Sequence, residues 1–105
     1  PAPAVARKLA RAGALVTVYD PQGMANAQRE APEVTYAGSL ADAVTGADLV
    51  CVLTEWEEFR NADPATLGEL VAQKKIIDGR NCLDHTLWLR AGWEYRGMGR
   101  PVLRR

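Results

Sequence analysis

The strongest constraint on the fold is the alternation, along the whole chain, of helical patterns with short apolar segments rich in β-branched residues. Helices are expected over residues 2–12, 39–46, 63–71 and 83–91. Strands are expected over residues 14–19, 34–36, 48–53, 75–78 and 93–96. This order predicts an α/β fold, a three-layer sandwich with a mainly parallel, Rossmann-like sheet and right-handed crossovers.

Two of these elements carry a distinct apolar pattern. In the first helix, Val5 and Leu9 lie four residues apart and define an apolar face that alanines widen. Residues 48–53 are almost continuously apolar, which is typical of a strand in the middle of a sheet covered on both faces. A length of 105 residues suits one domain, so we expect a single domain over residues 1–105.

The connections are expected to hold shorter helical pieces. Thr54 can cap a short helix that carries Trp56. Asp63 and Pro64 have the residue types that begin a helix. Residues 22–32 are the least constrained part of the chain, and a single helical turn is expected there.

Charge and cysteine content argue against several classes of protein. Thirteen basic and thirteen acidic residues cancel, so no net field favours nucleic acid or an anionic membrane. The longest apolar run, residues 49–53, is far shorter than a membrane span. Cys51 and Cys82 form no disulfide framework, and with His85 as the single histidine they have no zinc-ligand spacing. We therefore expect a cytoplasmic protein without a metal.

Polar and glycine residues gather just after the expected strands. In open parallel sheets, ligands bind in the crevice outside the carboxyl ends of the strands. The residues in these positions are Asp20, Pro21, Thr54, Glu55, Trp56, Gly79, Arg80, Asn81 and residues 97–100. A binding site is therefore expected at this edge.

Arg80 is the leading candidate within that edge, because it follows a strand and a glycine that permits a tight turn. Its planar fork of donors suits a diphosphate or a carboxylate. The alternative is a structural arginine that pairs with Asp78 or Glu55 and holds two loops together. The pattern alone leaves both interpretations open.

The other candidates are weaker. Asp20 stands where a dinucleotide-binding fold places its ribose-binding acid, but no G-x-G-x-x-G precedes it, and a turn-forming Asp-Pro is favoured. Cys82 has no evident histidine or lysine to activate it, which disfavours a nucleophile. Cys51 is expected to pack in the core and His85 to lie on the surface. Core or interface positions are favoured over base stacking for Trp56, Trp88 and Trp93.

Four short motifs stand at these strand ends. They are residues 18–21 (V-Y-D-P), 53–59 (L-T-E-W-E-E-F), 78–81 (D-G-R-N) and 95–100 (Y-R-G-M-G-R). In order and spacing they resemble motifs of the UDP-glucose/GDP-mannose dehydrogenase family. The resemblance extends over almost the whole chain, from residue 3 to about residue 101.

The resemblance implies the C-terminal, sugar-nucleotide-binding domain of such an enzyme. Family members oxidise the C6 alcohol of UDP-glucose to a carboxylate, with two NAD and a covalent thioester on a cysteine. Their N-terminal NAD-binding domain, central helical region and nucleophilic cysteine have no counterpart in this sequence, and Cys82 does not match that cysteine. We therefore expect the chain to bind a UDP-sugar and to catalyse no reaction alone.

The resemblance also implies roles for single residues. Arg80 is expected to contact the substrate on its UDP side, in a loop that Asp78 and Asn81 shape. Thr54 and Glu55 line the same edge, either as substrate contacts or as braces for Arg80. NAD is expected mainly on the N-terminal dehydrogenase domain, which is a partner together with the UDP-sugar, and the intact enzyme is expected to be a homodimer or larger.

Rival interpretations remain. The substrate could be GDP-mannose or a UDP-N-acetyl sugar, although T-E-W and D-G-R-N together are most similar to the UDP-glucose branch. A regulatory or protein-interaction domain could have kept the fold and lost the site. A small NAD-binding enzyme that uses Asp20 is disfavoured because the glycine fingerprint is missing.

Overall fold

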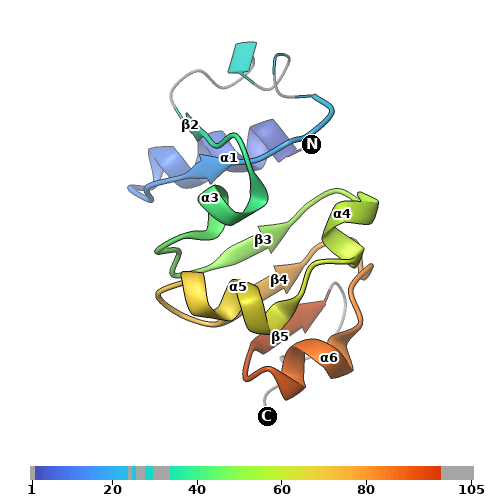
Figure 1. Ribbon diagram of the computed structural model, residues 1–105. Coiled ribbons are helices and arrows are strands. Elements are labelled where there is room, and N and C mark those ends of the chain that lie inside the picture. Colours follow the sequence, from blue (N-terminus) through green and yellow to red (C-terminus); the bar gives the residue numbers. More distant parts are fainter. Residues whose placement is uncertain (1, 24, 26–27, 30–33, 98–105) are drawn as a thin grey trace. The chain divides into compact units, whose positions relative to one another are not determined.

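A computed structural model describes residues 2–23, 25, 28–29 and 34–97 of the chain. These residues form two compact units, which divide between Ala43 and Val44. Each unit has its own parallel sheet (Figure 1). The two units are described separately below.

The first unit combines one helix with a two-stranded parallel sheet. Helix α1 (Ala2–Arg11) is followed by strands β1 (Thr17–Val18) and β2 (Thr35–Tyr36). The strands are in register from Thr17 opposite Thr35 to Val18 opposite Tyr36. Both are shorter than the sequence predicts. Of residues 22–32, Ala25, Gln28 and Arg29 are described and are helical.

The core of this unit corrects the expected face of α1. Ala6 and Val34 are its buried residues, with exposed fractions of 5% and 8%. Val5 and Leu9 are each 40% exposed, so the face that they define is not the buried one. The alanine stripe packs inward instead, because small side chains let the helix lie close to the sheet. Helix α3 (Leu40–Val44) begins after Ser39, whose Oγ accepts a 3.1 Å hydrogen bond from the Asp42 N–H, the expected cap.

The second unit contains a three-stranded parallel sheet in the order β3–β4–β5. Its strands are β3 (Val50–Val52), β4 (Lys75–Asp78) and β5 (Glu94–Gly97). Strand β4 is the central strand of this sheet, so the expectation that residues 48–53 lie in the middle is wrong for the sheet described. The partial exposure of Val50 and Cys51 is consistent with this outer position.

Three helices accompany this sheet: α4 (Glu57–Arg60), α5 (Pro64–Leu70) and α6 (His85–Arg90). The Asp63 carboxylate accepts a hydrogen bond from the Ala65 N–H, which confirms the predicted start of α5. Helix α4 begins later than predicted. Its N-cap position is occupied by Trp56, in an extended conformation, and not by Thr54. The acidic residues of its first turn instead complement the helix dipole.

Aromatic side chains dominate the core of the second unit. Trp93 and Tyr95 are 1% and 0% exposed, and Ile76 of the central strand is 2% exposed. The Trp88 and Trp93 rings pack edge to face at 4.8 Å between centroids. The Trp93 indole N–H donates to the Pro64 carbonyl oxygen at 2.9 Å. These contacts confirm the expected core positions of two of the three tryptophans.

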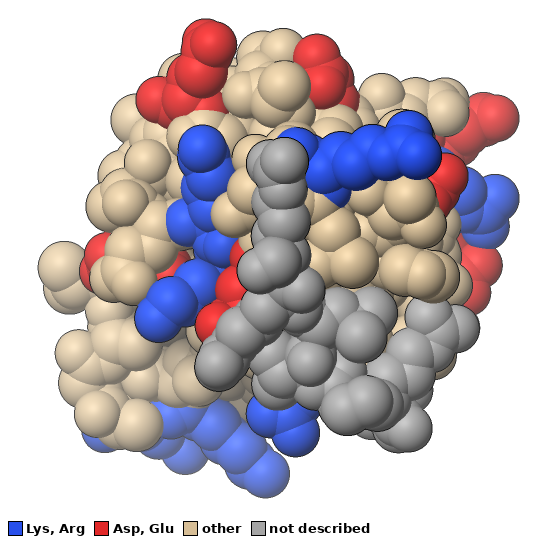
Figure 2. Space-filling view, turned by 90° about the horizontal axis from the view of Figure 1, so that it is seen from below, with Lys and Arg blue, Asp and Glu red and all other residues tan. Residues whose placement is uncertain are grey.

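Parallel sheets connected through helices make this an α/β, Rossmann-like sandwich, as the sequence predicts. In the described residues, no helix has the length and apolarity needed to cross a bilayer. Figure 2 shows basic and acidic side chains interspersed with uncharged surface on the face in view. Residues 98–100, which the sequence places at the binding edge, lie outside the described part of the chain.

Candidate functional site

The candidate site is built on the loop that follows β4, the central strand of the second unit. The Gly79 N–H donates a 2.8 Å hydrogen bond to the Val52 carbonyl oxygen of β3. A Cβ atom at position 79 would lie 3.0 Å from that same oxygen. A glycine is therefore favoured here, because a residue with a Cβ atom would require the loop or β3 to shift by a few tenths of an ångström. The loop leaves the sheet in contact with the end of the neighbouring strand.

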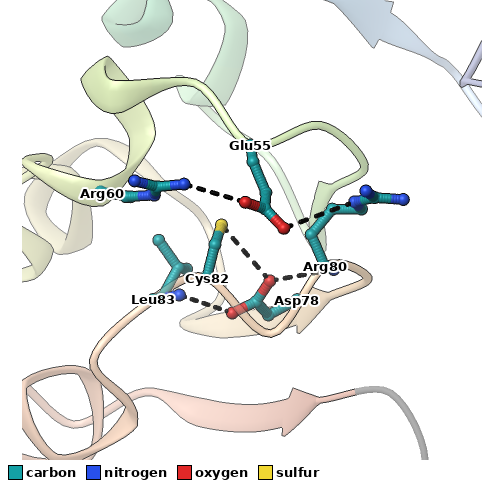
Figure 3. Close-up of polar contacts among 6 residues, drawn as sticks. All are labelled: Glu55, Arg60, Asp78, Arg80, Cys82 and Leu83. Atoms are coloured by element: carbon teal, nitrogen blue, oxygen red, sulfur yellow. Dashed lines mark hydrogen bonds and ion pairs between the residues drawn. The ribbon is translucent and has the colours of Figure 1, made fainter.

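The Asp78 side chain fixes this loop through hydrogen bonds to its backbone. Its carboxylate accepts hydrogen bonds from the Leu83 N–H at 2.8 Å, the Arg80 N–H at 3.2 Å and the Tyr95 hydroxyl at 2.7 Å. The Cys82 thiol lies 3.8 Å from the same carboxylate. Figure 3 shows the contacts of Asp78 with Leu83, Arg80 and Cys82. Asp78 is fully buried, so it shapes the loop and offers no surface to a ligand in this structure.

Burial and hydrogen bonding act in opposite directions on Asp78. Burial raises the pKa of its carboxyl, whereas the hydrogen bonds from Leu83, Tyr95 and the loop backbone lower it, and the net result is a pKa below the ordinary value. The carboxylate is therefore charged at neutral pH. Its charge is stabilised by hydrogen bonds from the loop backbone and from the Tyr95 hydroxyl.

Asn81 completes the turn of the loop. Its φ of 52° lies in the left-handed region, where asparagine and glycine are tolerated best. The Asn81 N–H donates to the Asp78 carbonyl oxygen at 3.3 Å. Asn81 is therefore an exposed residue that shapes the loop.

Three charged side chains meet above this loop, drawn in Figure 3. The Glu55 carboxylate accepts a 2.8 Å hydrogen bond from Nη2 of Arg60. Its other oxygen lies 3.9 Å from Nε of Arg80, an ion pair that is too long for a hydrogen bond. The Arg80 side chain is thus paired with Glu55. The hydrogen bond from Arg80 to Asp78 is donated by the backbone N–H of Arg80. The Arg80 side chain remains 57% exposed.

The structure therefore brings together most of the residues predicted for this site. Arg80, Asp78 and Asn81 share one loop, and Glu55 faces it from the segment between β3 and α4. Thr54 is partly buried directly before Glu55 in the chain. No hydrogen-bond partner for the buried Trp56 indole nitrogen is found among the described residues.

Two participants were not singled out from the sequence. Arg60 reaches Glu55 from the last turn of α4, five residues away, and no motif marked it. Tyr95 reaches Asp78 from a strand seventeen residues away. Tyr95 belongs to the last of the four motifs, so the signal was present, but its link to Asp78 depends on the pairing of β4 with β5.

Asp20, in the first unit, behaves as a turn residue. Its Oδ1 accepts hydrogen bonds from the Gln22 N–H at 3.1 Å and the Gly23 N–H at 2.8 Å. This geometry supports the turn that the sequence favoured over a ribose-binding acid. A hollow of about 420 Å³ lies in the same unit, lined by Tyr19, Asp20, Pro21, Gln28, Tyr36, Ala37 and Gly38.

Neither cysteine has the electrostatics of a nucleophile. Burial raises the pKa of the Cys82 thiol, and the charges of Asp78 and Glu55 raise it further. Burial also raises the pKa of Cys51. Reactive cysteines need the opposite shift, because the thiolate is the attacking species. The described edge thus presents the partly exposed side chains of Arg60 and Arg80, whose guanidiniums suit an anion, and its described residues hold no activated thiol.

Comparison with known proteins shows the family of the chain. The UDP-glucose/GDP-mannose dehydrogenase family, UDP binding domain, matches residues 1–85 of the chain. UDP-glucose 6-dehydrogenase YwqF of Bacillus subtilis is 35% identical over 104 residues, which cover 98% of this chain and 24% of the relative. UDP-glucose 6-dehydrogenase of Rhizobium meliloti is 37% identical over 101 residues, which cover 96% of this chain and 23% of the relative.

A third relative is similar over a shorter stretch. UDP-glucose 6-dehydrogenase AglM of the archaeon Haloferax volcanii is 34% identical over 87 residues, which cover 83% of this chain and 19% of the relative. The chain spans about a quarter of the length of the curated relatives it matches, or less. On this evidence, the chain belongs to the UDP-glucose/GDP-mannose dehydrogenase family and corresponds to its UDP binding domain.

Proposed function

We propose that this chain holds the UDP part of a UDP-sugar and that Arg80 contacts the diphosphate. The observation that carries the proposal is that Asp78 and Arg80, two charged residues of one loop, have different partners. The Asp78 carboxylate is engaged by backbone N–H groups and the Tyr95 hydroxyl, so it does not take up the Arg80 guanidinium. That guanidinium is more than half exposed at the carboxyl ends of β3 and β4, where a parallel sheet binds its ligands.

The chemical fit favours a diphosphate. A guanidinium presents parallel N–H donors that match two phosphate oxygens, and charge-assisted hydrogen bonds of this kind are stronger than neutral ones. Asn81 lies next to Arg80 and is exposed at the same edge of the sheet. Glu55 and Thr54 line the same edge, as contacts or as braces.

In the intact enzyme, this chain supplies positioning and the other domains supply the chemistry. The proposed reaction is oxidation of UDP-glucose to UDP-glucuronate with two NAD, in the cytoplasm. The N-terminal domain binds NAD, the nucleophilic cysteine belongs to a glycine-rich segment upstream of this domain, and the enzyme is a homodimer or larger. Positioning of this kind matters, because displacement of a reacting group by about 1 Å can lower the rate on the order of a hundredfold.

UDP-glucose is proposed over two other substrates, GDP-mannose and a UDP-N-acetyl sugar. The names of the similar enzymes favour it, and so do the T-E-W and D-G-R-N motifs. A regulatory or interaction domain without a ligand is the second candidate. The exposure of Arg80 argues against this candidate, because its side chain is 57% exposed at the edge where a parallel sheet binds its ligands.

The test is a titration of UDP and UDP-glucose into the chain, followed by amide chemical shifts. Shifts are expected at residues 54–56 and 79–81, with weak affinity, because the remaining contacts lie in other domains. Arg80→Ala should abolish these shifts, whereas the matched control Arg11→Ala, on α1 of the first unit, should leave them unchanged. Absence of shifts at millimolar UDP, or an Arg80→Ala variant that binds normally, would contradict the proposal.

A second measurement tests the division of labour. The chain is expected to form no NADH from UDP-glucose and NAD. UDP-glucose-dependent NADH formation by the chain alone would show that the chemistry does not depend on other domains.

A further inference from the structure

Arg60 and Arg80 converge on one carboxylate, although they come from different elements. Arg60 ends α4, and Arg80 lies in the loop after β4. Nη2 of Arg60 is 2.8 Å from one oxygen of Glu55, and Nε of Arg80 is 3.9 Å from the other. The two cationic groups therefore lie on either side of one carboxylate, each next to a different oxygen (Figure 3).

We propose that Arg60 is a second anion contact of this site, and that Glu55 occupies the place that a diphosphate takes when it binds. The inference rests on the proposed function, which assigns Arg80 to the diphosphate. A diphosphate carries two anionic groups joined through one bridging oxygen. Two guanidiniums that already meet at one carboxylate are spaced to receive such a pair of neighbouring anions.

The exposure of the three side chains supports exchange of Glu55 for a ligand. Arg60 is 50% exposed, Arg80 57% and Glu55 41%. Ion pairs this exposed contribute little to stability, so they are broken at small cost. The Arg80–Glu55 pair has no hydrogen bond to lose. A phosphate that offers bidentate hydrogen bonds to each guanidinium is a better partner than a carboxylate shared between both.

A purely structural Arg60 would act differently. In that case it would hold Glu55 and the segment before α4 in place, and its removal would weaken every nucleotide to the same degree. As a contact of the second phosphate, Arg60 must instead distinguish a nucleoside diphosphate from a monophosphate. The ratio of the UMP and UDP dissociation constants separates the two roles.

The experiment measures UMP and UDP binding to the chain and to its Arg60→Ala, Arg60→Lys and Arg80→Ala variants by amide chemical shifts. Arg60→Ala should weaken UDP about fivefold to tenfold, as expected for loss of a charge-assisted contact that is partly solvated, and should change UMP less than about twofold. Arg60→Lys keeps the charge and loses the fork, so it should fall between the wild type and Arg60→Ala. Arg11→Ala is the charge-matched control.

The outcomes distinguish the inference from the proposal beneath it. Suppose that Arg80→Ala abolishes binding, while Arg60→Ala weakens UMP and UDP binding equally or leaves both unchanged. Arg60 is then structural, and this inference is overturned while the proposed function stands. If neither arginine affects UDP, or the wild type binds no UDP, the proposed function fails as well. Loss of the preference for UDP over UMP in Arg60→Ala alone supports the inference.

Discussion

The Tyr95 hydroxyl donates a 2.7 Å hydrogen bond to the Asp78 carboxylate and thereby connects β5 to the loop that carries Arg80. Both residues are 0% exposed. The same carboxylate accepts from the Leu83 N–H at the far end of the loop. One buried charge thus fixes both ends of residues 79–83, and the position of Arg80 depends on a hydrogen bond that comes from β5.

Tyr95→Phe should destabilise the fold, because it removes the hydroxyl and leaves the ring in place. The expected loss is about 1.5–3 kcal/mol in the free energy of unfolding, the range for a hydrogen bond to a charged group. Urea unfolding of the wild type, Tyr95→Phe, Asp78→Asn and the double variant measures the coupling between the two residues. Additive effects of the two changes would show that the hydrogen bond contributes nothing.

Asp78 predicts a dependence of stability on acid. Its folded-state pKa lies below the ordinary value, so the unfolded chain takes up the proton first as the pH falls. The stabilising contribution is therefore complete above about pH 4, the ordinary range of an aspartate, and is lost as the pH falls through the folded-state pKa. Denaturant unfolding should show the wild type and Asp78→Asn far apart at neutral pH and converging in acid. A gap that stays constant over this range would contradict the assignment.

Asn81 tests the conformation of the loop rather than its contacts. Alanine and glycine both remove the amide, but only glycine adopts a φ of 52° without strain. Asn81→Ala should be less stable than Asn81→Gly by about 1 kcal/mol, the cost of the left-handed region for a residue with a Cβ. Thermal unfolding of the two variants makes the comparison. Equal stability would mean that the loop relaxes to another conformation.

The sequence predicts most of this fold because its signals are local. The segment 75–78 and the Asp63 cap of α5 appear where the pattern placed them. The predicted buried face of α1 is wrong, because the prediction places the large apolar residues Val5 and Leu9 inside. The face that packs against the core carries Ala6 and Ala10 instead. Periodicity shows that a helix has an apolar stripe, but it does not show which of two stripes is covered.

The candidate site was predictable only in part for a similar reason. The rule that ligands bind at the carboxyl ends of parallel strands located Arg80 from the sequence alone. The roles of Arg60 and Tyr95 depend on which strands pair and on where α4 begins. The sequence pattern predicts a helix cap at Thr54, whereas Trp56 occupies the N-cap position. The pattern therefore does not show that Glu55 faces Arg60.

Glu55→Gln separates a competitor of the ligand from a brace. If Glu55 occupies the place of the diphosphate, removal of its negative charge should tighten UDP binding by about twofold to fivefold, because two guanidiniums lose their internal partner and the ligand loses a repelling charge. Stability should change by less than about 1 kcal/mol, since both ion pairs are exposed. Glu57→Gln, an equal change of charge two residues along on α4, is the matched control and should have a smaller effect. Weaker UDP binding in Glu55→Gln at unchanged stability would instead establish Glu55 as the residue that holds Arg80 in position for the ligand.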